Sequence, residues 1–242
     1  MKVYLNSIEG MDDALVTMYM SKRSWTSELE NEIRGDWFSY SVLKDSSINT
    51  ETVQQAITNT ETRIKSFCKW AWRHITMLDF ITISVTVEGM HRAGQDDWDA
   101  HACRYNNRII RSSTRLADFA EGEMSDFYKG KIIPTDVALK KLGIEIPNKI
   151  EVDGEIYVKT VNGYILEDLK DDRDVKRGLY MESIPSNFIF KCNMAQWAHV
   201  YKLRNKNGTA NPEVKELAEA IQDQIEKQMP WFNREFIMKV EI

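Results

Sequence analysis

Apolar and polar residues alternate most clearly at residues 81–89, which read ITISVTVEG. Isoleucine or valine occupies every odd position from 81 to 87, and threonine or serine lies between them. A period of two predicts a strand with one buried face and one polar face. Related patterns predict an opening strand at residues 2–8 and a late strand at residues 183–193.

Apolar residues recur at helical spacing in several longer segments. The longest, residues 51–74, contains no Gly or Pro and keeps its apolar side chains on one side. Ser27 and Glu30 form a capping-box pattern for a helix that begins near them. Asn211 and Pro212 predict another helix start, because Asn caps helix N-termini and Pro suits the first turn. Further helices are predicted at residues 12–25, 101–115 and 193–204.

The pattern becomes β-rich between residues 149 and 169. Asp153-Gly154 and Asn162-Gly163 separate short runs of β-forming residues, which is typical of consecutive hairpins. This predicts a β-hairpin-rich insertion at about residues 130–175, within a single domain that covers residues 1–242. The order of strands and helices predicts an α+β fold with a central, mostly antiparallel sheet flanked by helices.

Composition limits the classes of protein to consider. A chain of 242 residues, 43% of them hydrophobic, is long enough to bury a large core. The net charge of -5 argues against a general nucleic-acid coat. The three cysteines are odd in number and widely spaced, which favours neither a disulfide framework nor a zinc ribbon and fits a reducing cytoplasm. No signal segment or membrane-spanning run is indicated.

Four arginines recur at intervals of four, three and four after a polar connector at residues 91–97. On a helix this spacing places all four guanidinium groups on one face: Arg104, Arg108, Arg111 and Arg115. One interpretation is a solvated face paired with nearby carboxylates: Asp99, Asp118 and Glu121. The other is a phosphate site, because guanidinium groups bind phosphate through two parallel hydrogen bonds and helices after buried strands often hold anions.

Other common chemistries lack their motifs. The four histidines form no metal box, His101-x-Cys103 is too sparse for zinc, and no signature supports a catalytic Cys–His pair. The sequence contains no G-x-G-x-x-G and no P-loop. Asn193 and Arg204 are eleven residues apart and share one face of the predicted helix at 193–204. The same helix is expected to be anchored in the core by Met194, Trp197 and Tyr201.

Several short motifs follow one another in a distinctive order. VEGMHRA is similar to a family's EGxSRA-like turn after a strand, and ACRY is similar to its S-x-R-Y element. Later helices are matched by NMAQWAHVYKLR, ANPEVKELA and KQMPWF, and RHITMLDF resembles an upstream H-x-x-x-x-E-H segment. Together these pieces span about residues 50–235 in matching order and resemble the flavin-dependent thymidylate synthases (ThyX).

The resemblance implies reductive methylation of dUMP at C5, with methylenetetrahydrofolate as carbon donor, FAD as carrier and NADPH as reductant. It implies a homotetramer with sites built between subunits. The spacing of histidines and cysteines indicates no metal site, and no catalytic residue is assigned. The positions that match nucleotide-binding residues of the family are Arg104, Arg177 and Arg204. Those that match its cofactor-binding region are His74, Arg92, Asn193 and His199. We therefore expect a divergent member of the family, compatible with a phage origin.

The chain departs from the family pattern at defined positions. The R-H-R triplet is missing, and GQDDWDA occupies a shortened interval between Arg92 and Arg104. Ala102, Ala195 and Lys215 stand where the family has Ser, Arg and Arg. Each lost charged hydrogen bond is worth ~1.5–3 kcal/mol, so flavin binding is affected most. Alternatives are a nucleotide-binding homologue without flavin chemistry, an enzyme that modifies another pyrimidine nucleotide, for example by hydroxymethylation, and a nucleic-acid-binding module, which the net charge disfavours.

Overall fold

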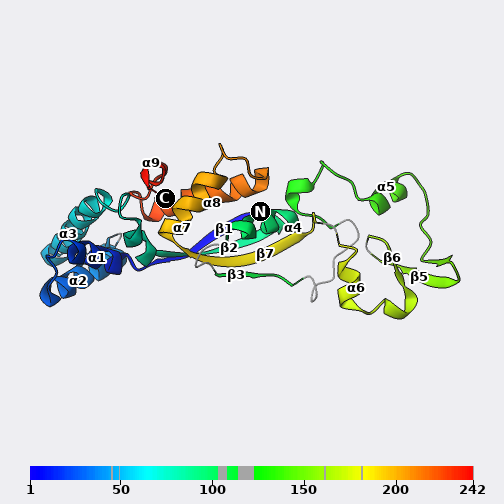
Figure 1. The fold of residues 1–242 in the computed structure, drawn as a ribbon, viewed down its shortest axis with the longest axis horizontal. Coiled ribbons are helices and arrows are strands. Elements are labelled where there is room, and N and C mark those ends of the chain that lie inside the picture. The colour runs from blue at the N-terminus through cyan, green and yellow to red at the C-terminus, as the bar shows by residue number, and fades with distance from the viewer. Residues whose placement is uncertain are drawn as a thin grey trace. The chain divides into compact units, whose positions relative to one another are not determined.

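The structure is a computed structural model that describes residues 1–44, 46–48, 50–102, 108–113, 123–160, 162–180 and 182–241. The side chains of residues 100–102, 108 and 177 lie outside this description. Its strands form a four-stranded sheet in the order β1-β2-β7-β3 and a three-stranded sheet in the order β4-β5-β6 (Figure 1). The α+β class predicted from the sequence, with antiparallel sheets flanked by helices, is confirmed.

The bounds of the described strands and helices are as follows. The strands are β1 Lys2–Glu9, β2 Thr82–His91, β3 Arg108–Arg111, β4 Lys149–Val152, β5 Glu155–Lys159, β6 Tyr164–Leu166 and β7 Pro185–Asn193. The α-helices are α1 Met11–Ser21, α2 Ser27–Leu43, α3 Glu51–Cys68, α4 Arg92–Ala102, α5 Thr135–Lys141, α6 Arg173–Arg177, α7 Met194–Arg204, α8 Pro212–Gln228 and α9 Arg234–Lys239. Short 3₁₀ helices are η1 Ile75–Phe80, η2 Asp126–Tyr128 and η3 Glu167–Leu169.

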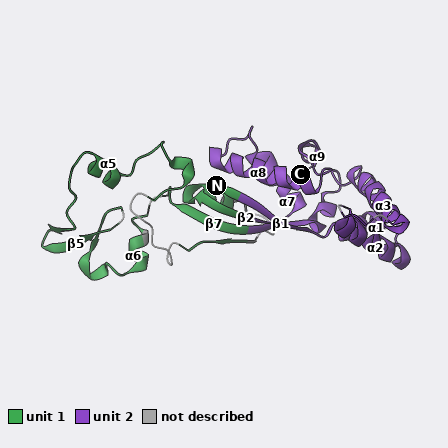
Figure 2. Cartoon of the chain, turned by 180° about the vertical axis from the view of Figure 1, so that it is seen from behind, with its two compact units in different colours: residues 1–2, 87–100, 109–189 green, residues 3–86, 101–108, 190–242 purple. Residues whose placement is uncertain are grey.

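The chain divides into two compact units, which Figure 2 colours separately. Unit 1 comprises Met1–Lys2, Val87–Ala100 and Ile109–Ile189. Unit 2 comprises Val3–Thr86, His101–Arg108 and Phe190–Ile242. The organisation as one domain with an insertion stays a prediction. Among the described helices, none is long and apolar enough to cross a membrane.

Unit 2 is built from helices that bury apolar faces against one another. Helix α2 packs on α3, α1 packs on both, and α7 packs against η1, α8 and α9. Trp197 in the first half of α7 is fully buried, and its indole N–H donates to Oε1 of Gln222 at 2.8 Å. A buried indole needs such an acceptor because an unpaired N–H would lose its hydration without compensation. Helix α7 is therefore a fixed part of this core.

The local sequence signals are confirmed where they act over a few residues. Ile81, Ile83, Val85 and Val87 are fully buried, as the alternation in this strand predicts. Helix α8 begins as predicted, with the Asn211 side chain accepting from the N–H of Glu213 at 3.0 Å. Such caps stabilise a helix by about 1 kcal/mol, since they satisfy a backbone donor that the helix leaves unpaired.

Two helix boundaries differ from those predicted. The cap of α2 is Thr26 rather than Ser27, because Thr26 is extended and its hydroxyl accepts from the N–H of Leu29 at 3.1 Å. Helix α3 ends at Cys68 instead of continuing to residue 74. Its backbone tightens there, since the N–H of Trp70 donates to the carbonyl of Phe67 at 2.9 Å, three residues back.

The hairpin-rich region lies within unit 1 and is confirmed. In the β4–β5 hairpin Val152 faces Glu155, and both turn residues, Asp153 and Gly154, have positive φ angles of 51° and 87°. This backbone matches the two-residue hairpin turns that Asp-Gly favours. The β5–β6 pair is antiparallel with Lys159 opposite Tyr164. The same part of the chain also contains helices α5 and α6, which the sequence pattern did not predict.

The helix predicted at residues 101–115 is wrong. Helix α4 ends at Ala102, and Arg108–Arg111 form strand β3 at the edge next to β7. The backbone N–H of Ser112 donates to the carbonyl of Asn187 at 2.8 Å, a long-range bond that helical spacing cannot reveal. The segment predicted as a polar connector is helix α4 instead. Arg108 and Arg111 therefore lie on a strand, whereas Arg104 and Arg115 lie outside the described residues.

Candidate functional site

The last residues of β2 are held by several hydrogen bonds within unit 1. Gly89 has a φ of 78°, a left-handed conformation that glycine adopts without strain. Its N–H donates to Oδ1 of Asn187 at 2.8 Å, and its carbonyl accepts from the hydroxyl of Ser125 at 3.0 Å. The N–H of Arg92 donates to the carbonyl of Ile184 at 3.1 Å. The VEGMHRA motif is thus a rigid corner between β2 and α4.

A cavity of about 650 Å³ opens beside this corner. Gly89 and Ser125 lie on its wall together with two lysines, Lys129 and Lys141. Lys129 forms an ion pair with Asp126, which also lines the cavity. The corner therefore has one open side that is lined by both charged and apolar residues.

His91 occupies the interior of the corner. Its side chain is fully buried, stacks on Phe127 with ring centroids 5.4 Å apart and meets the edge of Tyr128 at 4.7 Å. A Cβ atom at Gly94 would lie 2.8 Å from Cε1 of His91, so the first turn of α4 needs glycine there. His91 is thus a packed core residue of unit 1.

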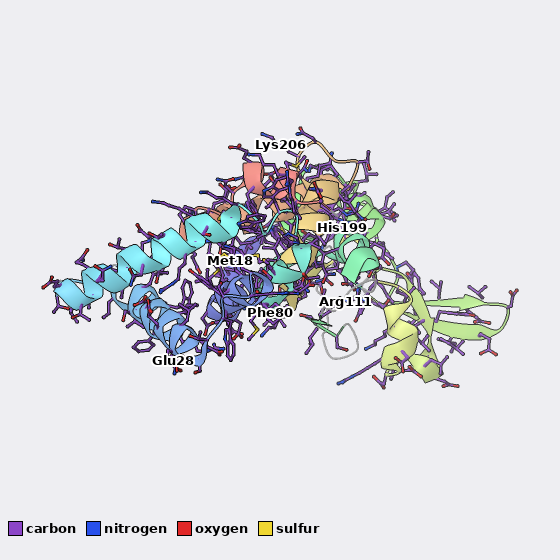
Figure 3. The ribbon with its side chains drawn as sticks, turned by 60° about the vertical axis from the view of Figure 1, so that its left-hand side comes forward. Met18, Glu28, Phe80, Arg111, His199 and Lys206 are labelled. Carbon is purple, nitrogen blue, oxygen red and sulfur yellow. The ribbon has the colours of Figure 1, made fainter. Side chains whose placement is uncertain are left out.

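The arginines near α4 face carboxylates. Arg111 on β3, labelled in Figure 3, binds Oδ1 of Asp96 at 2.5 Å and Oδ2 of Asp99 at 2.8 Å. Burial raises the pKa of Asp99, while the charge of Arg111 opposes that rise. Arg92 lies 3.9 Å from the same Asp96. The ion pair between Arg111 and Asp99 is one that the interpretation of arginines neutralised by nearby carboxylates predicts. The other two predicted carboxylates, Asp118 and Glu121, lie outside the described residues.

Helix α7 and its N-cap include three of the predicted site residues. Asn193 caps it, and its side chain accepts from the N–H of Gln196 at 2.8 Å. His199 lies in the middle of the helix and is partly exposed (Figure 3). Arg204 is its last residue, with a partly exposed side chain whose Nε atom is buried. The helix is anchored by Met194, Trp197 and Tyr201, all buried as predicted.

The remaining predicted residues are more scattered. His74 precedes η1 in unit 2, and its exposed ring lies over Trp70 with centroids 6.3 Å apart. Arg92 belongs to unit 1. Arg177 ends helix α6, but its side chain lies outside the description, and Arg104 lies outside the described residues altogether. The structure thus places Asn193 at the cap of α7 and His199 and Arg204 on that helix, and the assignment of all these residues to a site stays a prediction.

The surroundings of His74 fit a planar aromatic group. Trp70 is 44% exposed, and the ammonium of Lys22 lies 5.8 Å from the centre of its ring. The guanidinium of Arg73 lies 4.3 Å from the ring of Trp72. Exposed aromatic faces with nearby cations attract flat, electron-rich or anionic ring systems by stacking. These residues could therefore hold the ring of a flavin, although no R-H-R triplet is available for its phosphates.

Comparisons with known proteins decide the family. The model of the family described as "Thymidylate synthase complementing protein" matches residues 13–231, which is most of the chain. The chain belongs to this family. The ThyX resemblance predicted from the sequence is thereby confirmed. A search of curated proteins gives no significant match.

Solved ThyX-type structures share the fold. ThyX from Helicobacter pylori with FAD and dUMP is 12% identical, with a TM-score of 0.51 and coverage of 98% of this chain and 99% of that one. The UMP/dUMP methylase PolB from Streptomyces cacaoi, bound with 5-Br dUMP, is 13% identical, with a TM-score of 0.56 and coverage of 100% and 97%. At such low sequence identities, the similarity to these structures shows the fold of this chain and no more.

Sequence reasoning missed the residues that hold the end of α7. Glu219 on α8 binds Tyr201, the backbone of Lys206 and Arg234 of α9. Its position inside an otherwise regular amphipathic helix gives no signal of this role. The C-terminal turn of α7, which carries Arg204, is therefore positioned by residues that become neighbours only in the folded chain.

Proposed function

We propose that this chain is a flavin-dependent enzyme that methylates dUMP at C5. Methylenetetrahydrofolate would supply the one-carbon unit and NADPH the two electrons that reduce it, so that a methyl group replaces the C5 hydrogen and tetrahydrofolate and NADP⁺ are released. The observation that carries the proposal is the family match over residues 13–231. The neighbours that bind FAD and dUMP, or act as a UMP/dUMP methylase, support it.

The nucleotide would be held by arginines. Arg204 is the member of the predicted set whose surroundings are described, and its guanidinium group suits a phosphate or a pyrimidine carbonyl. Arg104 and Arg177 would complete the set. Because Arg204 ends a helix buried on several sides, the nucleotide would meet a preorganised cation, which lowers the entropy cost of binding.

The cofactor would lie against the aromatic residues near His74. FAD, when bound, would carry the hydride between NADPH and the one-carbon unit. The chain would bind and orient its ring through His74 and Trp70, and Asn193, His199 and Arg92 would contact other parts of it. No cysteine nucleophile is required, and burial raises the pKa of Cys68 to about 12, which leaves that thiol protonated at neutral pH.

A second candidate is a nucleotide-binding homologue that has lost flavin chemistry or that modifies another pyrimidine nucleotide. Its support is the set of carboxylates around α4. Asp96 and Asp99 neutralise Arg111, close in sequence to where the family carries R-H-R. Negative charge at this place would weaken the binding of a diphosphate-containing cofactor.

The proposed nucleotide site is tested by replacing Arg204 with Ala. We expect dUMP affinity to fall about 10- to 100-fold, because a charged hydrogen bond contributes ~1.5–3 kcal/mol. The matched control is Lys206→Ala. Lys206 lies two residues after Arg204 and has an exposed side chain, so removing its positive charge should change the affinity for dUMP less than about twofold. Isothermal titration calorimetry with dUMP measures both. Unchanged affinity in Arg204→Ala would contradict the site assignment.

A further inference from the structure

The last turn of α7 is held on both sides of Arg204. The hydroxyl of Tyr201, three residues before Arg204, donates to both carboxylate oxygens of Glu219 at 3.1 and 3.0 Å. The backbone N–H of Lys206, two residues after Arg204, donates to Oε1 of Glu219 at 3.0 Å. The carboxylate of Glu219 on α8 therefore fixes the chain both before and after Arg204.

The turn that follows Arg204 has its own bonds. Asn205 is buried, its N–H donates to the carbonyl of Tyr201 at 2.8 Å, and its side-chain N–H donates to the carbonyl of Lys202 at 3.1 Å. The N–H of Gly208 donates to the carbonyl of Asn205 at 2.8 Å. A Cβ atom at Gly208 would lie 2.3 Å from the carbonyl oxygen of Leu203, so this close approach requires glycine. The backbone at Arg204 has little freedom.

Glu219 is itself fixed by a cation. Arg234 of α9 donates to Oε2 of Glu219 at 2.8 Å and to the hydroxyl of Tyr201 at 3.0 Å. Arg234 also pairs with Asp223 at 2.6 Å and Glu226 at 3.0 Å. Burial alone would raise the pKa of Glu219, but hydrogen bonds from Lys206, Arg234 and Tyr201 outweigh it and hold that pKa below its usual value. The carboxylate is thus ionised at neutral pH and can accept all of these bonds.

Tyr201 remains a donor under the same conditions. Burial raises its pKa to about 12, and Arg234 opposes that rise. Its hydroxyl therefore accepts from Arg234 and donates to Glu219, a relay that needs the neutral phenol. Such connected bonds fix side chains more firmly than isolated ones, because losing one partner leaves the others buried and unpaired.

We propose that Glu219 is a positioning residue, which sets the backbone at the end of α7 and thereby places Arg204 for nucleotide binding. The inference rests on the proposed function, because it requires Arg204 to contact the nucleotide. Glu219 does not touch the nucleotide in this proposal. It acts through the hydroxyl of Tyr201 and the backbone N–H of Lys206, and Arg234 supplies the charge that keeps it in place.

A double-mutant cycle tests the proposal with dUMP as the titrated ligand. Glu219→Gln replaces the carboxylate oxygen that accepts a hydrogen bond from Arg234 with an amide N–H₂ group, which can only donate. The loss of this bond should displace the last turn of α7 and weaken dUMP binding about tenfold. In an Arg204→Ala background the same change should cost less than about twofold, because its effect passes through Arg204. Equal costs in both backgrounds would overturn the positioning role.

A matched control separates positioning from loss of stability. Asp223→Asn removes another carboxylate from Arg234, but Asp223 is 59% exposed and bonds to neither Tyr201 nor Lys206. It should leave dUMP affinity within about twofold, whereas Tyr201→Phe, which removes only the hydroxyl, should weaken it several-fold. Thermal unfolding of each variant reports whether the fold survives, and Tyr201→Phe serves if Glu219→Gln does not fold.

The outcomes distinguish the two proposals. If Arg204→Ala leaves dUMP affinity unchanged, the nucleotide site fails, and the positioning role of Glu219 falls with it. If Arg204→Ala weakens binding while both Glu219→Gln and Tyr201→Phe do not, the site stands and the positioning role is wrong. Weakening by Glu219→Gln that disappears in the Arg204→Ala background supports both.

Discussion

Gly10 shows how much a single backbone position controls. It precedes α1 with a φ of 81°, and its carbonyl accepts from the N–H of Ala14 at 3.0 Å. A Cβ atom there would lie 2.0 Å from the carbonyl oxygen of Phe80. Both the left-handed backbone and the close approach of another segment demand glycine, and only the first of these follows from local geometry.

Gly10→Ala should lower the free energy of unfolding by about 3 kcal/mol or more. Left-handed strain costs ~1–2 kcal/mol and overpacking against a backbone carbonyl costs ~1–3 kcal/mol. Gly143→Ala is the matched control, since Gly143 has a φ of 71° but no atom within 4 Å of the added Cβ. It should cost only the strain. Urea unfolding measures both, and equal costs would show that the contact with Phe80 is relieved.

At the scale of elements, the pair α2 and α3 is held together by a buried cation. Arg63 of α3 has a side chain only 9% exposed and forms ion pairs with Asp36 and Glu32 of α2. Asp36 is also shielded, at 15% exposure, whereas Glu32 is 54% exposed. The Arg63–Asp36 pair is therefore the important one, because the exposed pair is screened by solvent.

Arg63→Ala should destabilise the protein by about 3 kcal/mol, because it leaves the shielded carboxylate of Asp36 without its cation. Glu32→Gln, which removes only the exposed partner, should cost less than about 1 kcal/mol. The free energies of unfolding in urea give the comparison. A cost for Arg63→Ala no larger than that for Glu32→Gln would show that Asp36 finds water or another donor.

At the scale of the whole molecule, the chain belongs to the thymidylate synthase complementing protein family, and it shares its fold with a ThyX whose solved structure contains FAD and dUMP. We infer that it forms a homotetramer with sites between subunits, as the family resemblance implies. Light scattering on the purified protein should give four times the chain mass of 28.2 kDa. A visible flavin band in the same peak, with FAD released on denaturation, would support the methylase. A colourless tetramer that stays colourless after incubation with FAD would favour the homologue without flavin chemistry.

The sequence by itself determined the features that depend on neighbours along the chain. The alternation in β2, the Asn211 cap of α8 and the Asp-Gly hairpin all appear as predicted. Each is specified within a few residues, by side-chain period, a capping hydrogen bond or a turn conformation. The family was also visible, because the order of short motifs survives even where single positions have changed.

Only the tertiary structure decided the rest. RIIR could belong to a helix by spacing, yet it forms β3, which pairs with β7, and the Ser112 that follows it bonds to Asn187, seventy-five residues later. Arg111 binds Asp96 and Asp99, and Glu219 bonds to Tyr201 and Lys206. The period of apolar residues along the sequence does not predict these contacts, because the partners lie far apart in the helical and strand patterns. The energy of an ion pair depends on the distance between the two charges in space. The partners of a charged side chain are therefore decided only when the fold brings distant segments together.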